Sequence, residues 1–240
     1  MQVVVLAGGL GTRMRPLTTT MPKALIPVAG RPFAEHQVAL LAANGVDDVV
    51  FSIAYLGGMI RDALGDGSRF GVRIRYVDEG DERRGTGGAV RLVAASGLAD
   101  EVFAVLYGDS YLPIRYQEVW AAYPTCGAPA LMTVLDNGDR WDTSNAAFGA
   151  DGMLSYQKGA GANRGMHYID YGLSVLPRQL VMDRLPGGEV SDLADFFTGL
   201  GDRGELAGFE VHDRFYEVGS AAGIADLEEL LERRDGATRT

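Results

Sequence analysis

Short apolar runs alternate with helix-like segments through the first half of the chain. The runs are rich in valine, isoleucine and phenylalanine and are bounded by glycine or polar residues, which is typical of buried strands. They predict strands at residues 2–6, 48–54, 72–77 and 102–106. The segments between them predict helices at residues 32–44, 57–64 and 85–95. This alternation predicts an α/β fold with a doubly wound, mostly parallel Rossmann-like sheet that binds ligands at the carboxyl ends of its strands.

The pattern changes in the second half, where shorter β-type segments dominate. They predict strands at 128–135, 145–148, 154–157 and 167–175, and helices at 191–200 and 220–233. Hairpin-type turns are expected at Gly138 and at Asp151-Gly152. No interdomain linker is visible, so we expect one domain over residues 1–240, with a β-rich extension over 126–233 and a polar tail over 234–240.

Composition narrows the class of protein. The chain has 240 residues, 47% of them hydrophobic, and a formal net charge of −10, which argues against a nucleic-acid-binding surface. No run of 18 apolar residues predicts a membrane span, and the N-terminus lacks the features of a signal peptide, so the cytoplasm is the expected location. Cys126 is the single cysteine, and the three histidines are far apart without metal-ligand spacing.

One segment departs from the acidic balance. Residues 1–34 contain Arg13, Arg15, Lys23 and Arg31 and no acidic residue. The first predicted strand leads directly into a loop with three glycines, whose backbone N–H groups can turn toward an anion. The loop is not a dinucleotide fingerprint, because Met14 stands where the third glycine belongs, and no Walker P-loop string occurs. A glycine-rich, cationic loop after a buried strand predicts a phosphate site.

The same segment carries a longer pattern: Gly8-Gly9-Leu10-Gly11-Thr12-Arg13, then Pro16, Pro22-Lys23-Ala24-Leu25 and Pro27-Val28. On this pattern the chain is identified as a member of the sugar-1-phosphate nucleotidyltransferases, the nucleoside-diphosphate-sugar pyrophosphorylases. Further segments resemble motifs of that family, at residues 65–72, 85–89, 107–110 and 215–220. The chain is most similar to short bacterial members, the heptose-1-phosphate guanylyltransferases and N-acetylmuramate-1-phosphate uridylyltransferases.

The resemblance implies transfer of a nucleotidyl group from an NTP to a sugar 1-phosphate, which yields an NDP-sugar and pyrophosphate. It implies catalytic roles for Arg13, on the β- and γ-phosphates, and for Lys23, between the α-phosphate and the incoming phosphate. Residues 1–125 would then bind the nucleotide and residues 126–233 the sugar and the metal. The implied nucleotide-binding residues are Leu6, Ala7, Gly8, Gly9, Gly11, Thr12, Thr86, Gly87 and Gly88. The GTGGA string at 85–89 favours GTP with a heptose- or mannose-type sugar phosphate, although Arg83-Arg84 replaces the glutamine-containing string of many relatives.

Two carboxylates are the expected Mg²⁺ ligands. Asp109 ends a buried apolar strand, where an unpaired carboxylate would be costly and a hard cation would offset that cost. A helix N-cap is the alternative role for Asp109. Glu217 stands where most of the family has Asp, and it would be the second ligand, directly or through a water; an ordinary surface glutamate is the alternative.

The sugar phosphate is expected on the second half of the chain. Lys158 resembles the lysine that the family uses on the sugar phosphate, and Lys23 and Lys158 are the two lysines among 22 basic residues. Sugar contacts are expected from Trp141, Asn145, Asp170 and Tyr171, with a hydrogen-bonded turn as the alternative role of residues 141–145.

Two other functions stay open at this level. One is nucleotidyl transfer to a non-sugar phosphate such as phosphocholine, and the other is a non-catalytic regulatory subunit that binds an NDP-sugar. The partners expected are the NTP and the sugar 1-phosphate, with no nucleic acid and no membrane, and the chain is expected to be a monomer or a homodimer.

Overall fold

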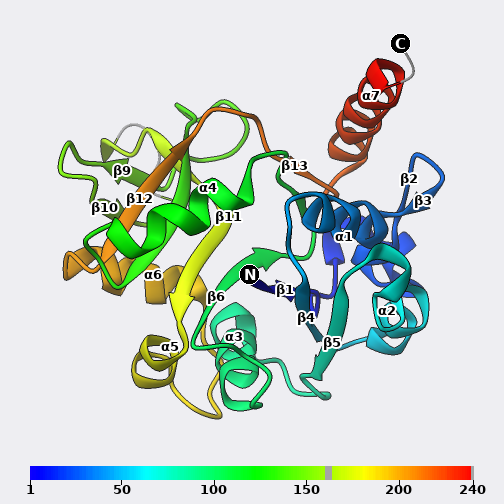
Figure 1. Ribbon diagram of the computed structural model, residues 1–240, viewed down its shortest axis with the longest axis horizontal. Helices are drawn as coiled ribbons and strands as arrows, with labels where there is room; N and C mark the ends of the chain where they lie inside the picture. The colour runs from blue at the N-terminus through cyan, green and yellow to red at the C-terminus, as the bar shows by residue number, and fades with distance from the viewer. Residues whose placement is uncertain (160–163, 239–240) are drawn as a thin grey trace.

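The computed structural model describes residues 1–159 and 164–238. Its main sheet has the strand order β10-β9-β11-β6-β1-β4-β5, with β8 paired to β11 and β12 paired to β8 (Figure 1). The strands of this sheet are β1 (Gln2–Leu6), β4 (Asp48–Ile53), β5 (Arg73–Asp78), β6 (Val102–Tyr107), β8 (Ala130–Asp136), β9 (Ala146–Phe148), β10 (Leu154–Tyr156), β11 (Tyr168–Pro177) and β12 (Leu206–Val211). Two small ribbons add β2 (Pro27–Val28) with β3 (Arg31–Pro32), and β7 (Ser110–Tyr111) with β13 (Tyr216–Glu217).

Helices cover both faces of the sheet. They are α1 (Phe33–Ala43), α2 (Gly57–Leu64), α3 (Gly85–Ala95), α4 (Tyr116–Ala122), α5 (Arg178–Arg184), α6 (Leu193–Asp202) and α7 (Ala221–Thr238). Single turns of 3-10 helix occur at η1 (Thr12–Met14), η2 (Leu17–Thr19), η3 (Lys23–Leu25), η4 (Ser68–Phe70) and η5 (Tyr123–Thr125). Within the described part of the chain, none of these helices combines the length and apolar character that a membrane crossing requires.

The central strands β6, β1, β4 and β5 run parallel, as the apolar runs predict. Successive residues of β1 face opposite sides of the sheet, so Val3 and Val5 pack in one core and Val4 in the other. The first core contains side chains of α1, α2 and α4, and the second contains side chains of α3, α5 and α6. The doubly wound part of the expected fold is therefore confirmed, and the carboxyl ends of its parallel strands meet at one edge.

The second half of the chain extends this sheet with antiparallel strands. Strand β11 pairs antiparallel with β6 and with β8, and β9 and β10 form a hairpin around Asp151-Gly152. The expected hairpin at Gly138 is wrong, because β8 and β9 do not pair with each other. The N–H groups of Asn137 and Gly138 instead donate to the His167 carbonyl, which fixes the turn to the start of β11.

Apart from the two small ribbons and the 3-10 turns, three elements have no counterpart in the sequence prediction: α4, α5 and β12. Strand β12 contains Gly208, a poor strand former, but its parallel pairing with β8 and the Phe148 ring above Gly208 hold it in the sheet. The predicted end of the last helix is also wrong. Helix α7 continues to Thr238, so residues 234–238 of the expected tail are helical.

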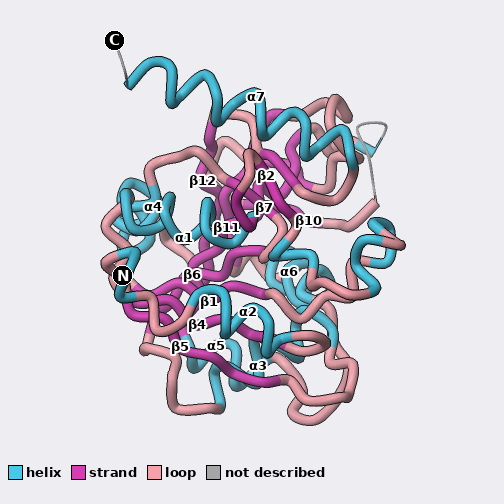
Figure 2. Tube along the Cα trace, turned by 90° about the vertical axis from the view of Figure 1, so that its right-hand side faces the viewer, coloured by secondary structure: helices cyan, strands magenta, loops and turns pink. Residues whose placement is uncertain are grey.

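The C-terminal segment returns to the first half of the chain. Strand β13 pairs with β7, and Val218, just after β13, shares a buried cluster with Val28 and Phe33. Leu227 places the first part of α7 in the same cluster, and Figure 2 shows the rest of α7 extending beyond the body. This contact brings residue 217 next to residue 110, more than one hundred positions away in the sequence.

Asp48 fixes the opposite, amino-terminal edge of the sheet. This buried carboxylate accepts hydrogen bonds from Gln2 Nε2 at 2.8 Å, Arg75 Nη2 at 2.5 Å and Arg73 Nη2 at 3.2 Å, which joins β1, β4 and β5. Burial alone would raise the pKa of Asp48, but the hydrogen bonds from Gln2, Arg75 and Arg73 hold it below its ordinary value.

We predict that Asp48→Asn lowers the free energy of unfolding at pH 7 by about 1–3 kcal/mol, because two arginines lose their shared anion. Because the folded pKa of Asp48 is lowered, the wild-type advantage is present above the unfolded pKa and declines as the pH falls through the folded pKa. Urea unfolding at pH 7 and near pH 3 measures the difference. A deficit of the same size at both pH values would contradict the assigned role of the carboxylate charge.

Candidate active site

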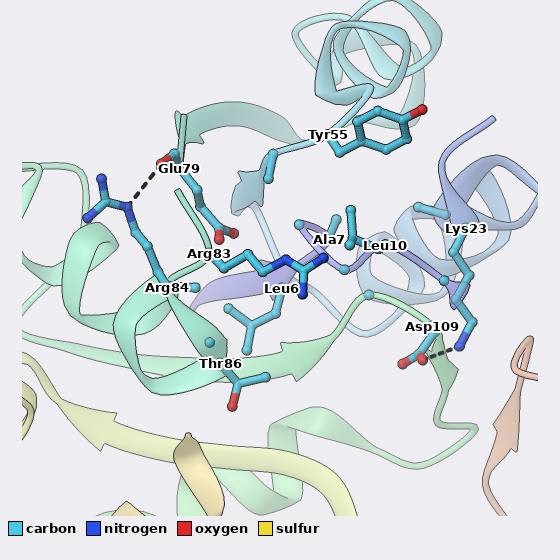
Figure 3. Close-up of a pocket in the computed structure, with 18 of the residues that line it drawn as sticks. Leu6, Ala7, Leu10, Lys23, Tyr55, Glu79, Arg83, Arg84, Thr86 and Asp109 are labelled. Atoms are coloured by element: carbon cyan, nitrogen blue, oxygen red, sulfur yellow. Dashed lines mark hydrogen bonds and ion pairs between the residues drawn. The ribbon is translucent and has the colours of Figure 1, made fainter. Parts of the chain in front are cut away.

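A cavity of about 730 Å³ opens at the carboxyl edge of the parallel strands. The lining side chains in Figure 3 come from the loop after β1, η3, the segment after β4, the loop between β5 and α3, the first turn of α3, and the end of β6. The residues of the sequence prediction that line it are Leu6, Ala7, Gly8, Gly9, Gly11, Thr12, Lys23, Thr86 and Asp109. The fold thus brings most of the predicted nucleotide-binding residues to one place, while their contacts with a nucleotide stay a prediction.

The glycine loop fits the backbone geometry of an anion site. A Cβ on Gly8 would overlap the carboxyl group of Glu79, and Gly11 has φ +57° and lies against Thr18. Both positions therefore favour glycine. Among the described residues, no hydrogen-bond acceptor is paired with the backbone N–H groups of residues 8–12. These donors are available to a ligand at the cavity wall.

Lys23 and Asp109 form an ion pair at the edge of this cavity. Lys23 Nζ lies 2.5 Å from Asp109 Oδ2, and the two side chains are 14% and 32% exposed. The turn that carries Asp109 is fixed from below, because the buried Gln37 donates hydrogen bonds to the carbonyls of Tyr107 and Ser110. Asp109 is therefore held at the end of β6 with its carboxylate toward the cavity (Figure 3).

Glu217 joins this group from the far end of the chain. Its partner in the β7–β13 ribbon is Ser110, and the Val218 N–H donates to the Asp109 carbonyl at 3.0 Å. Although Glu217 keeps contact with solvent, crowding by protein atoms raises its pKa to about 7, and the charge of Asp109 adds to the effect. The charges of Lys23 and Arg13 act in the opposite direction.

The two predicted metal ligands therefore meet in space. A raised carboxylate pKa beside a second carboxylate marks a place where a divalent cation would relieve repulsion, and Mg²⁺ takes one or two protein carboxylates together with phosphate oxygens. In the described ranges, no group of three or more His, Cys, Asp or Glu side chains forms a complete cation site. Asp109 and Glu217 thus fit an ion that is shared with a phosphate ligand rather than enclosed by protein.

Arg13 lies on η1, next to the cavity but outside its lining. Its side chain is exposed, and it makes no ion pair with any residue that the structure describes. Among the charges that act on Glu217, Arg13 lowers the pKa of that carboxyl group. A cation that is free and close to a candidate phosphate site is consistent with the role predicted for it.

Asp192 connects the cavity residue Thr86 with Lys158. Its carboxylate caps α6 by accepting the Ala194 N–H at 3.0 Å, and it also accepts the Thr86 hydroxyl at 2.8 Å and Lys158 Nζ at 3.0 Å. Thr86 lines the cavity, so the shared Asp192 carboxylate holds Lys158 close to the edge of the cavity. The structure therefore positions Lys158 near the candidate nucleotide site across 72 residues of sequence.

Gly87 and Gly88 occupy a different environment. Neither lines the cavity, and their N–H groups donate to the Ser191 carbonyl at 2.9 and 3.3 Å. The first turn of α3 is therefore closed by the segment before α6 rather than open toward the cavity. Their contact with a nucleobase stays a prediction that this geometry does not support.

The four candidate sugar contacts occupy a second region, beyond the described lining of the cavity. Tyr171 is 2% exposed and packs against Phe215, so it serves the core rather than an accessible surface. Trp141 is 38% exposed and packs edge-on to the same Phe215 ring. Asn145 Oδ1 accepts the N–H of Asp170 at 2.8 Å, which ties the 141–145 turn to β11.

The surroundings of Asp170 disfavour the charged form of its carboxyl group. It accepts the Gly172 N–H at 2.9 Å, but burial raises its pKa to about 6. Its side chain makes no ion pair within the parts of the chain that the structure covers. A partly buried, unpaired acceptor on β11 is suited to hydroxyl groups, as the sequence prediction requires.

Comparison with known proteins decides the family. The family model described as nucleotidyl transferase matches residues 2–149, which is more than half of the chain. The chain belongs to the nucleotidyl transferase family. The match includes the glycine loop, Lys23, Thr86 and Asp109.

Curated relatives of this nucleotidyltransferase include one that matches over almost all of both chains. An N-acetylmuramate α-1-phosphate uridylyltransferase of Neisseria meningitidis is 30% identical over 96% of this chain and 98% of its own. A mannose-1-phosphate guanylyltransferase of Mycobacterium tuberculosis is 42% identical, but over 44% of this chain and 29% of its own. The chain thus corresponds to the whole of the first protein and to less than a third of the second.

Solved structures show the same fold. The structure of HddC from Yersinia pseudotuberculosis in complex with GMP-PN has a TM-score of 0.78 at 22% identity, over 96% of this chain and 99% of that chain. A putative glucose-1-phosphate thymidylyltransferase from Bacillus anthracis has a TM-score of 0.80 at 20% identity, over 96% and 94% of the two chains. The mixed α/β fold of this nucleotidyltransferase is therefore that of the nucleotidyltransferase structures.

Among the cavity and cavity-edge residues that the sequence does not predict in this nucleotidyltransferase, three carry charges of interest: Glu79, Arg83 and Asp192. Glu79 is buried, accepts the Ser52 hydroxyl at 2.9 Å and turns its carboxyl group toward the cavity (Figure 3). Burial raises its pKa. A signal for Glu79 existed, because it lies two residues after the predicted strand 72–77, whereas no local pattern marks Asp192 as a cavity residue.

We predict that Asp170→Asn stabilises the nucleotidyltransferase at pH 8 and leaves its stability unchanged near pH 3. The folded pKa of Asp170 is raised, so the wild type loses stability as the pH rises from the unfolded value of about 3.8 through about 6. The amide keeps an acceptor for Gly172 and carries no charge. Thermal melting without ligand should show a gain of several degrees at the higher pH; a variant that melts below the wild type at pH 8 would refute the assignment.

Proposed function

We propose that this nucleotidyltransferase makes an NDP-sugar and pyrophosphate from an NTP and a sugar 1-phosphate. An oxygen of the sugar phosphate attacks the α-phosphorus, the bond between that phosphorus and the bridging oxygen breaks, and pyrophosphate leaves with the electron pair. The observation that carries the proposal is the meeting of Lys23, Asp109 and Glu217 beside a glycine loop with free N–H groups. The full-length likeness to a uridylyltransferase supports the same reaction class.

The chain contributes position and charge rather than covalent chemistry. The N–H groups of residues 8–12 would hold the triphosphate at the cavity wall. Lys23 would exchange part of its contact with Asp109 for phosphate oxygens, between two anionic reactants that otherwise repel each other. Arg13 would bind the outer phosphates, on which charge accumulates as pyrophosphate leaves.

Asp109 and Glu217 would hold the Mg²⁺ ion. When bound there, the ion supplies neutralisation of phosphate charge. Glu217 is one methylene longer than the aspartate that is common at this family position, and its contact with the ribbon residue Ser110 keeps it next to Asp109. A cation held by these residues would favour the charged form of Glu217 and oppose the rise of its pKa.

The cavity favours bases with a ring N–H. Glu79 offers a hydrogen-bond acceptor, and guanine, uracil and thymine each carry an imino N–H, whereas adenine and cytosine present acceptors at the same ring position. The relatives named above, and a further relative from Streptomyces antibioticus, are named as uridylyl-, guanylyl- and thymidylyltransferases. These names agree with a preference for bases that carry a ring N–H. Of these bases, we keep guanine as the first candidate on the GTGGA string at 85–89.

Residues 1–125 form the nucleotide half in this proposal, and residues 126–233 provide the sugar side. Lys158 would bind the phosphate of the acceptor from its place beside Asp192. Because NTPs and sugar phosphates are cytoplasmic metabolites, we propose that the protein acts there. Whether it acts as a monomer or a homodimer stays a prediction.

We predict that the protein releases pyrophosphate when it is mixed with Mg²⁺, GTP, UTP or dTTP, and a panel of hexose, heptose and N-acetylated sugar 1-phosphates. ATP and CTP should give at most weak turnover, because they lack the ring N–H that Glu79 can accept. Phosphocholine belongs in the panel as a non-sugar acceptor. If phosphocholine is the one acceptor that yields pyrophosphate, the proposed acceptor changes from a sugar phosphate to phosphocholine. If no combination of NTP and acceptor yields pyrophosphate, the proposed catalysis is refuted.

We predict that Lys23→Ala lowers kcat by about 10²–10³-fold, because one charge that stabilises the transition state is removed. Arg31→Ala is the matched control, since Arg31 is a cation of the same N-terminal segment that pairs with Glu35 on the surface. Circular dichroism and thermal melting should show the native fold in both variants. Unchanged turnover of folded Lys23→Ala would remove Lys23 from the mechanism.

We predict that Glu217→Gln lowers the apparent affinity for Mg²⁺, measured from activity, by about 10–100-fold. Glu217→Asp should bind Mg²⁺ nearly as tightly as the wild type. The reason is loss of one of two carboxylates, while aspartate restores the charge. Titration of Mg²⁺ at saturating NTP measures the shift. Equal Mg²⁺ affinity of the glutamine variant and the wild type would exclude Glu217 from the metal site.

A further inference from the structure

Three cations line the nucleotide cavity, and two of them are already engaged. Lys23 pairs with Asp109 at 2.5 Å. Arg84 pairs with Glu82 at 3.5 Å, and its Nε donates to the Glu79 carbonyl at 2.9 Å. Arg83 makes no hydrogen bond or ion pair with any residue in 1–159 or 164–238. It is therefore the uncommitted positive charge of this cavity.

The loop that carries Arg83 gives it freedom that its neighbour lacks. The loop lies between Gly80, with φ +72°, and Gly85, with φ +69°. The Arg84 carbonyl accepts the Ser191 N–H at 3.0 Å, so Arg84 is fixed through both its backbone and its side chain. Arg83 is exposed, and Figure 3 shows its side chain extending away from the loop across the cavity, toward the end of β1.

The charge balance of the cavity requires such a cation. Its lining contains four acidic side chains, Glu79, Asp81, Glu82 and Asp109, against three cations. A triphosphate that enters this acidic lining meets net repulsion unless a free cation turns toward it. A guanidinium also matches phosphate geometry, because its parallel N–H groups can donate to two phosphate oxygens at once.

We propose that Arg83 is a binding residue for the polyphosphate of the NTP, a third cation beside Arg13 and Lys23. Its guanidinium contacts the phosphates from the side of the 80–85 loop, opposite the N–H groups of residues 8–12. This inference rests on the proposed function, since it names a further residue for the same nucleotide. The sequence alone marks Arg83 only as a departure from the string of many relatives.

The proposal separates phosphate binding from base binding. Arg83→Ala should weaken GTP and UTP binding by about 10-fold or more, because a charge-assisted contact is lost. Arg83→Lys should recover part of the loss, since lysine keeps the charge without the planar fork. Inorganic tripolyphosphate should lose affinity by a similar factor, while guanosine and uridine, which carry no phosphate, should not. The dependence of NTP affinity on salt should also become weaker in Arg83→Ala.

The test is calorimetric titration of the full chain with GTP, UTP, tripolyphosphate, guanosine and uridine at two salt concentrations. Arg115→Ala is the matched control, because Arg115 is an exposed arginine that precedes α4 outside the cavity and pairs with Glu118. Thermal melting checks that the variants are folded; Arg83 has no partner among the described residues, so its loss should leave the melting temperature unchanged.

Each result decides the proposal. If Arg83→Ala weakens binding of the NTP and of the nucleoside by the same factor, Arg83 contacts the base or ribose and the assignment is overturned. Unchanged NTP affinity in Arg83→Ala would also overturn it. Binding is measured without an acceptor, so Arg83-dependent NTP binding in a protein that turns over no sugar phosphate would refute the proposed reaction and leave this inference intact. A wild-type chain that binds neither NTP nor tripolyphosphate would refute both.

Discussion

The parallel pairing of β1 with β4 and β6 is the constraint from which the site follows. Because these strands run in one direction, the loops after their carboxyl ends must leave the sheet at the same edge. The glycine loop follows β1, and Asp109 follows β6, so the two lie at the same edge although they are far apart in the sequence. The buried network around Asp48 secures the opposite edge, where no ligand is expected.

Electrostatics then gives this edge its chemical character. The chain carries a net charge of −10, and even the lining of its cavity has more acidic than basic side chains. Such a surface would repel an NTP, so the few cations near the cavity matter more than their number suggests. Lys23 pairs with Asp109, while Arg13 and Arg83 make no ion pair among the described residues. The site therefore holds both the carboxylates that suit a metal ion and the cations that suit phosphates.

Two long-range connections complete the site. The β7–β13 ribbon, supported by the cluster beneath α7, places Glu217 beside Asp109. The Asp192 carboxylate joins Thr86 to Lys158. Each connection links the first half of the chain to the second half through a small number of polar contacts. These contacts therefore join the two halves of the chain at the edge of the cavity.

The sequence by itself determined the central strands, the helices between them, the glycine loop and the family, because each depends on residues close together in the chain. Val3 to Val5, Gly8 to Gly11 and Lys23 act through local pattern and local backbone geometry. Tertiary structure decided what depends on distant partners: β12 stays a strand despite Gly208 because β8 pairs with it, and the Gly138 turn is fixed by His167 rather than by a hairpin. It also decided the surroundings of Glu79, Arg83 and Asp192, whose free or paired state is set by packing between segments that no local pattern connects.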